Sequence, residues 1–483
     1  MGRAPRPEAD PLAGFGTGDE GVRPTLEHLS PVMDVTPPRK ITLVPLIAAT
    51  YFMVAGGPYG LEDIVAKAGY TGAIVILVLT PLIWSLPTAL MVSELASAMP
   101  QEGGFYVWVT RAMGRFWGFQ EAWLSLAGSI FDMAIYPTLF VEYLGHFAPA
   151  LTSGGKGIWI GVALIAVCAI WNLLGSKAVG GSSVMMGVLL LSPFAVLTGY
   201  ALFSRSAPGA ASVPLHSGDL LGGILVAMWN FMGWDNASTI AGDVDRPQRT
   251  YLRAMLATLI LVTLTYVLPI AAVALTGLDP NRWSTGGWAE VARAVFGNGG
   301  AIRELAGRGA VIGITVGGMV GAAGTLNALT MSFSRLPAVM AEDGFLPKVF
   351  ARRHPGTGAP WVAITACATA WALCLGFDFV KLIVLDVLLT GLSILLEFVA
   401  LVVLRIREPQ LHRPYRVPGG LAGAIAVGVA PLALLVLTVV RNRTEAIGSI
   451  SALHVAGMLI AAGGLAYCVS ERVRAKTSSV PRS

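Results

Sequence analysis

Long apolar runs separated by short polar connections occupy most of the chain. A helix needs about 20 apolar residues to cross a bilayer core about 30 Å thick, and twelve runs reach roughly that length. Because backbone polar groups in lipid must be satisfied within a helix or a closed barrel, the pattern predicts an all-α polytopic membrane protein with twelve transmembrane helices. The predicted spans are 41–67, 71–98, 118–146, 157–174, 183–203, 219–241, 252–276, 308–331, 360–377, 382–404, 421–440 and 453–470.

Composition and the positions of the basic residues add an orientation. Of the 483 residues, 55% are hydrophobic and only 13% are charged, whereas a soluble domain has about 25% charged residues. Most of the 33 lysines and arginines fall in connections on the same side as the N-terminus. Cytoplasmic loops carry an excess of these residues, so we predict a cell-membrane protein with both termini in the cytoplasm. The net charge of +5 follows from this bias and indicates no nucleic-acid partner.

Two of the predicted spans are interrupted at their centres. The first contains "AGGPYGLED" at 55–63, where glycines and a proline break the helical pattern. The sixth has a polar centre around Asn230 and Asp235. Secondary transporters often carry discontinuous helices at corresponding positions of two repeats, and spans 1 and 6 lie five spans apart. A five-plus-five inverted repeat with broken helices 1 and 6 is therefore predicted. A proline kink and an unrelated polar patch are the alternative.

This repeat divides the chain into four parts. Residues 1–38 are rich in proline and lack an apolar run, so we predict a disordered cytoplasmic tail. Residues 39–420 form the predicted ten-helix core, and 421–470 add two peripheral transmembrane helices. Residues 471–483 are predicted to be a cytoplasmic C-terminal tail.

The signatures of several enzyme classes are missing from the sequence. It contains no HExxH motif, no G-x-x-x-x-G-K-[ST] loop and no cluster of cysteine and histidine. The four cysteines all lie within apolar spans and have no CxxC spacing. We therefore predict no enzyme activity, no catalytic residue, no cofactor and no metal site.

Five motifs carry a family resemblance. They resemble the amino acid–polyamine–organocation (APC) superfamily, most closely its polyamine/proton symporter branch, and the similarity covers roughly 39–470. The motifs are "GGPYGLED" (56–63), "MPQEGGFYVWVTRAMGRFWGFQEAW" (99–123), "WNFMGWDNASTIAGDVDRPQRTYLRA" (229–254), "VMAEDGFLPKVFARRHPGTGAP" (339–360) and "LRIREPQLHRPYRVPGG" (404–420).

The resemblance implies the leucine-transporter-like fold, with substrate held between spans 1, 3, 6, 8 and 10. Unwinding at the first break frees backbone groups, which lipid tolerates only where they line a cavity. Glycine lets a ligand approach the backbone closely, and Pro58 can open the following half-helix. We expect that half-helix to begin near Tyr59 and to direct the positive end of its dipole at the site.

Buried acids indicate the charge of the ligand. Acids lie in the middle of several spans, and no lysine or arginine lies mid-span to pair with them. Since each such acid is costly to insert, a cationic partner or protons are indicated. Asp132 shares a helix face with Tyr136, and Asp235 follows the second break. In the alternatives, Asp132 is a structural hydrogen-bonded acid, Asp235 is a helix cap and Glu94 binds neighbouring backbone or helices.

These arguments define the candidate site. The fifth span has no lysine of the kind that some proton-coupled relatives use in place of sodium, which favours a carboxylate as the proton carrier. The predicted substrate-binding residues are Gly56, Gly57, Pro58, Tyr59, Gly60, Asp132, Tyr136, Asn230, Trp234 and Asp235. The residues predicted for proton coupling or gating are Asp235, Glu121 and Glu94.

The sequence thus predicts a proton-coupled importer of polyamines or other small organic cations that works by alternating access. Its partners would be the small-molecule substrate, protons and the lipid bilayer. An L-amino-acid permease for neutral or cationic substrates is an alternative, because the first break could equally bind a carboxylate. A nutrient sensor that binds without transport is a further alternative, and the absence of long signalling tails argues against it.

Overall fold

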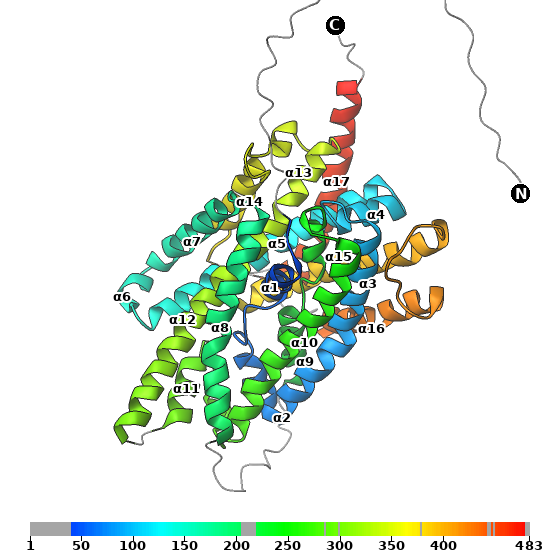
Figure 1. Ribbon diagram of the computed structural model, residues 1–483. Helices are drawn as coiled ribbons and strands as arrows, with labels where there is room; N and C mark the ends of the chain where they lie inside the picture. Colours follow the sequence, from blue (N-terminus) through cyan, green and yellow to red (C-terminus); the bar gives the residue numbers. More distant parts are fainter. Residues whose placement is uncertain are drawn as a thin grey trace, which may run out of the picture. The chain divides into compact units, whose positions relative to one another are not determined.

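The computed structural model describes residues 40–203, 219–284, 286–297, 300–376, 379–441, 446–447 and 450–478. The chain divides into two units, Met1–Pro38 and Arg39–Ser483. The first unit, and with it the tail predicted for 1–38, lies outside the described residues. The second unit is built almost entirely of helices, which run beside one another in Figure 1.

Most of the predicted spans coincide with helices, whereas the spans 41–67 and 219–241 are each interrupted. The bounds of the elements are α1 Leu43–Val54, α2 Glu62–Thr80, the π-helix η1 Pro81–Ser85, α3 Leu86–Ala98, α4 Phe105–Met113, α5 Arg115–Gly145, α6 Pro149–Thr152, α7 Lys156–Asn172, α8 Ser176–Phe203, α9 Leu220–Asn230, the 3₁₀ turns η2 Asp235–Thr239 and η3 Ala241–Asp243, α10 Pro247–Ala274, η4 Pro280–Arg282, α11 Trp288–Phe296, α12 Gly300–Phe333, α13 Arg335–Glu342, η5 Lys348–Ala351, α14 Trp361–Leu373, α15 Phe379–Arg407, α16 Gly420–Arg441, and α17 Ala452–Ser478. Two-residue strands, β1 Ala446–Ile447 and β2 Ile450–Ser451, pair before α17.

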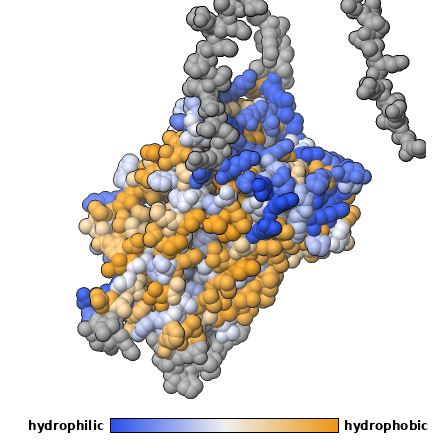
Figure 2. Space-filling view, viewed as in Figure 1, coloured by the Kyte–Doolittle hydropathy of each residue, from blue (hydrophilic) through white to orange (hydrophobic). Residues whose placement is uncertain are grey.

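The surface of the second unit suits a bilayer. Within the described residues, eight helices are long and apolar enough to cross a membrane, and three shorter apolar helices accompany them. Large apolar side chains are exposed along α8, including Met185, Val188 and Val196, an arrangement that water would disfavour. Figure 2 shows hydrophobic residues over much of this face, with hydrophilic residues gathered at the end that carries α4 and α13.

Burial separates a central helix from peripheral ones. In the most apolar window of α5, 67% of residues are buried, and α5 packs chiefly against α12 and α15. The corresponding fractions are 22% for both α8 and α16 and 17% for α17, so burial alone does not set α16 apart from the predicted core, and the division at residue 421 stays a prediction. The last helix continues to Ser478, past the predicted limit at 470, so the segment predicted as a C-terminal tail begins as a helix.

Both predicted interruptions are present. Helix α1 ends at Val54 and helical structure resumes at Glu62, later than the start expected near Tyr59. Helix α9 ends at Asn230, and a 3₁₀ turn begins at Asp235. A second bend at Gly69 (φ 65°) separates a short half-helix from the rest of α2, at the predicted connection between spans 1 and 2.

Glycines allow the two breaks to meet. Gly233 has a φ of 89°, and a Cβ at this position would collide with the carbonyl oxygen of Met53 at the end of α1. On the other side, a Cβ at Gly321 of α12 would collide with the carbonyl oxygen of Gly56. These close approaches require glycine, and they hold the unwound segments against each other and against α12.

Candidate functional site

A narrow cavity lies between the two breaks and α5 and α12. Its volume is about 20 Å³, enough for about one water molecule. A larger ligand therefore requires the surrounding elements to move apart. The lining residues are Val54, Gly56, Tyr59, Tyr136, Leu139, Tyr143, Trp229, Asn230, Gly318, Ala322 and Thr325.

Asp132 lies directly behind one end of this lining. Its side chain is only 8% exposed. The Tyr136 hydroxyl donates to Asp132 Oδ1 at 2.7 Å, and Trp229 Nε1 donates to the same oxygen at 3.3 Å. Tyr136 and Trp229 are stacked at 6.4 Å between ring centroids and both line the cavity. The structure therefore brings together the predicted pair Asp132 and Tyr136 and adds Trp229.

Glu62 lies behind a second pair of lining aromatic residues. It is fully buried, and the Tyr143 hydroxyl donates to its Oε1 at 3.0 Å. Tyr143 packs edge-on against Tyr59 at 5.0 Å. Glu62 was not among the predicted site residues, although the motif "GGPYGLED" contains it. The sequence assigns it to the half-helix after the break and does not show that it turns toward α5.

The residues of the first break have different roles. Gly56 and Tyr59 line the cavity. A Cβ at Gly57 would instead meet Leu190 of α8, and one at Gly60 would meet the Trp229 ring. The carbonyl oxygen of Pro58 accepts a hydrogen bond from Trp288 Nε1 at 2.7 Å. Gly57, Pro58 and Gly60 thus shape the break and do not themselves line the cavity.

The residues of the second break also have different roles. Asn230 lines the cavity, whereas Trp234 is fully buried and its Nε1 donates to the carbonyl oxygen of Phe231 at 2.9 Å. Asp235 is 2% exposed, and its Oδ1 has no hydrogen-bond partner within the described residues. It belongs to the first turn of η2, so a capping position and a functional role are both compatible with its place.

More buried acids lie between α5 and α15. Ser393 of α15 donates to Glu121 Oε1, and its hydroxyl also lies 2.8 Å from that of Ser125. Both carboxylate oxygens of the fully buried Glu397 have no hydrogen-bond partner within the described residues. Glu121 and Glu397 come from helices that pack closely together, and this pair extends the set of acids beyond the cavity.

Glu94 has quite different surroundings. Its carboxylate accepts from Arg405 Nε at 3.0 Å and again from Arg405 Nη2, and Arg413 Nε lies 3.2 Å away. The backbone N–H of Val417 donates to Glu94 Oε2 at 2.7 Å. Arg405 lies in the last turn of α15, so a basic residue from a span end reaches this acid. The arrangement is typical of a structural ion pair. The gating role of Glu94 stays a prediction.

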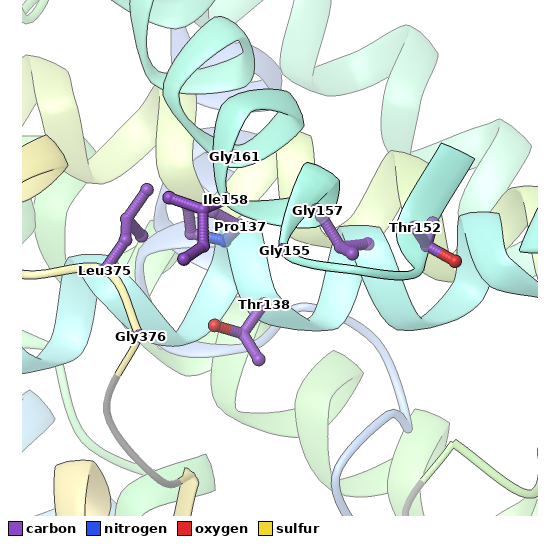
Figure 3. Close-up of a pocket in the computed structure, with 10 residues that line it drawn as sticks. Pro137, Thr138, Thr152, Gly155, Gly157, Ile158, Gly161, Leu375 and Gly376 are labelled. Carbon is purple, nitrogen blue, oxygen red and sulfur yellow. The ribbon is translucent and has the colours of Figure 1, made fainter. Parts of the chain in front are cut away.

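A larger cavity of about 310 Å³ lies elsewhere, between α5, α6 and α7 and close to the segment after α14. Figure 3 shows Pro137, Thr138, Ile158 and Leu375 at this cavity. No acidic or basic side chain lines it. Volume alone therefore does not identify the site, and the narrow cavity between the breaks is the better candidate.

Comparison with known proteins gives the family. A family model described as amino acid permease matches residues 47–459, which include both breaks and at least part of every helix that lines the cavity. The chain belongs to the amino acid permease family. This confirms the resemblance to the APC superfamily.

Relatives of this permease carry transporter names. It is 34% identical to "Polyamine transporter PUT1" of Oryza sativa subsp. japonica, over 84% of this chain and 75% of the relative. It is 30% identical to "Polyamine transporter RMV1" of Arabidopsis thaliana, over 91% and 87%. "Serine/threonine exchanger SteT" of Bacillus subtilis is 28% identical, over 70% and 76%. The permease is thus an integral membrane protein, and these names indicate transport and not catalysis.

Proposed function

We propose that this permease is a secondary active transporter that takes up polyamines or other small organic cations together with protons. The observation that carries the proposal is the carboxylate of Asp132, which is buried directly behind the cavity and hydrogen-bonded only by neutral groups, Tyr136 and Trp229. A buried charge needs a partner, and no ion pair of the described residues includes Asp132. A cationic substrate supplies that partner.

The proposed mechanism is alternating access in a twelve-span, five-plus-five inverted repeat. The contact between Gly233 and Met53 supports the repeat, because it joins the breaks of spans five apart. Asp235 and Glu121 are the proposed proton carriers. Asp235 is buried next to the second break, and Glu121 is buried between α5 and α15, which must move during transport. The names of the polyamine transporters favour the same substrate class.

Ion pairs close one end of the pathway in this conformation. Arg335 pairs with Glu102 at 3.2 Å and also with Asp243, and Arg353 pairs with Glu102 at 2.9 Å and with Glu342 at 2.8 Å. These groups join α13 and the loop after it to Glu102, in the connection between α3 and α4, and to Asp243 of η3. We propose that this network is the cytoplasmic gate, since it lies on the side where basic residues gather.

An amino-acid permease is the second candidate function. The serine/threonine exchanger among the relatives favours it, and the unwound backbone at Gly56 could accept a substrate carboxylate through free N–H groups. In that case the substrate amine alone would lie near Asp132. A nutrient sensor without transport has no specific observation in its favour.

Uptake by the purified permease in liposomes tests the proposal. With the interior made alkaline, labelled spermidine or putrescine should accumulate, and a protonophore should abolish the accumulation. Unlabelled leucine or serine in excess should compete poorly. Accumulation of leucine or serine without polyamine uptake would replace the proposal by the amino-acid permease.

Labelling of single cysteines tests the orientation. Arg416 and Arg293 are both exposed, so burial does not limit the reaction at either position. A cysteine at 416 should react with an impermeant reagent only from the cytoplasm, and one at 293 only from outside. The opposite pattern would reverse the orientation and place the proposed gate at the outer face.

A further inference from the structure

We propose that Glu62 and Asp132 are the two anionic ends of one binding site for linear molecules that carry an ammonium group at each end. This inference rests on the proposed transport of cations and narrows it to diamines and longer polyamines. It assigns a binding role to Glu62, whose carboxylate lies behind the opposite end of the cavity lining from Asp132.

Glu62 lacks a cationic partner within the protein. Its side chain is fully buried, the one side chain that donates to its Oε1 in the described part of the chain is the neutral Tyr143 hydroxyl, and its Oε2 has no hydrogen-bond partner within the described residues. Glu62 takes part in none of the ion pairs found among the described residues. A buried carboxylate with an unused oxygen beside a cavity can accept a donor from outside the chain.

The two ends of the lining are built alike. At one end Tyr59 and Tyr143 line the cavity and Tyr143 binds Glu62. At the other end Tyr136 and Trp229 line it and both bind Asp132. An ammonium group is attracted to the face of an aromatic ring, and a carboxylate hydrogen-bonded to that ring adds negative charge. Each end is therefore suited to one ammonium group.

The spacing and the lining between the ends suit a methylene chain. Tyr136 and Tyr143 lie two turns apart on the same helix, α5, which separates them by about 10 Å at roughly 1.5 Å per residue. Leu139 lies between these two tyrosines on α5, and Ala322 and Val54 add further apolar side chains to the lining. An amino acid would place its own carboxylate in a site already flanked by two acids, so a diamine fits the charges better.

Glycines of α12 leave the room for the Glu62 end. A Cβ at Gly317 would collide with the Tyr59 hydroxyl, and one at Gly318 would collide with the Tyr143 ring. Both tyrosines can therefore pack directly on the α12 backbone, where the Tyr59 hydroxyl donates to the carbonyl oxygen of Ile314. This packing holds the aromatic pair between Glu62 and the cavity.

Competition for uptake of labelled spermidine tests the assignment in liposomes that contain the full-length permease. Putrescine and butylamine have the same carbon chain and differ by one amine, so their apparent affinities should differ strongly for the wild type. Glu62→Gln should weaken putrescine about ten- to hundredfold, the range of a charge-assisted hydrogen bond. It should leave butylamine almost unchanged. Tyr143→Phe keeps the carboxylate and should weaken putrescine less.

A series of diamines of increasing length on the wild-type permease needs no variant. Two anionic ends at a fixed spacing predict an optimum chain length, whereas monoamines of the same lengths should show none. Equal losses for putrescine and butylamine in Glu62→Gln, or diamines and monoamines following the same length dependence, would overturn the inference while polyamine uptake persists. If the wild type takes up no polyamine, the proposed function fails first and the inference falls with it. If Glu62→Gln binds neither putrescine nor butylamine, the dependence of wild-type affinity on diamine length decides whether the inference holds.

Discussion

Two buried glutamates of this permease have opposite surroundings. Glu94 is enclosed by Arg405, Arg413 and a backbone N–H, all contributed by α15 and the loop that follows it. Glu62 is equally buried, yet within the described part of the chain a tyrosine hydroxyl is the one side-chain donor to it, and one of its oxygens has no partner. The chain thus supplies Glu94 with basic partners of its own, and we propose that Glu62, together with Asp132, binds a cation from outside.

The largest expected effect comes from matched Glu→Gln substitutions. Glu94→Gln leaves two buried guanidinium groups without a counter-charge, and loss of one partner from a buried ion pair costs about 3–5 kcal/mol. Glu62→Gln loses no ion pair and keeps an acceptor for Tyr143, so its unfolding free energy should change by less than about 1 kcal/mol. Denaturant unfolding of both variants in detergent measures the difference. Equal losses of unfolding free energy in the two variants would show that the surroundings of Glu62 and Glu94 do not differ in the way described.

A smaller effect, of opposite sign, is expected at Glu397. Both of its carboxylate oxygens lack hydrogen-bond partners within the described residues, and an unsatisfied buried polar group costs about 1–3 kcal/mol. Glu397→Met should therefore leave the unfolding free energy unchanged or raise it by up to about that amount. The same unfolding experiment serves here, with Glu94→Met as the control that should be destabilised. A loss of stability in Glu397→Met would mean that the Glu397 carboxylate has a stabilising partner in the folded protein.

The smallest effect belongs to an ion pair at the surface. Arg111 binds Glu408 through two hydrogen bonds, at 2.9 and 2.6 Å, and these bonds lower the pKa of Glu408. The contribution of this ion pair to the unfolding free energy is fully present above a pH of about 4.3, the pKa of a free glutamate. It is lost as the pH falls through the lower pKa that Glu408 has in the folded protein. The side chains are 42% and 31% exposed, so the contribution is only about 0.2–1 kcal/mol.

Comparing wild type with Glu408→Gln across acidic pH checks this sign. The stability gap between the two should narrow as pH is lowered and should shrink at high salt, because exposed pairs are screened. A gap that widens on acidification would mean that Glu408 is stabilised in its protonated form, which its contacts with Arg111 do not allow.

Local signals explain why the breaks were predictable. Glycine and proline interrupt a helix through their own backbone properties, so the segments around Gly56 and Gly233 could be placed from sequence. The pairing of Asp132 with Tyr136 also follows from helical spacing. Hydropathy likewise placed α16 and α17 within a residue or two of their starts.

Contacts between distant segments were not predictable in the same way. Glu62 meets a tyrosine 81 positions away, and Glu94 meets an arginine 311 positions away, and no periodicity of the chain reports either pair. The same holds for Gly57, which faces Leu190, and for Pro58, which binds Trp288. These residues lie in the predicted break, but tertiary packing decides which of them reach the cavity.

Calorimetry of spermidine binding to the wild type and to Asp132→Asn tests most directly whether the central acids are reserved for a cationic substrate. The substitution keeps the size of the side chain and removes its charge, so spermidine should bind more weakly by about 1.5–3 kcal/mol, which is roughly ten- to hundredfold. Leucine, titrated in parallel, should bind poorly to both proteins. Unchanged spermidine affinity in Asp132→Asn, with leucine bound tightly by both, would contradict the account and identify an amino-acid permease.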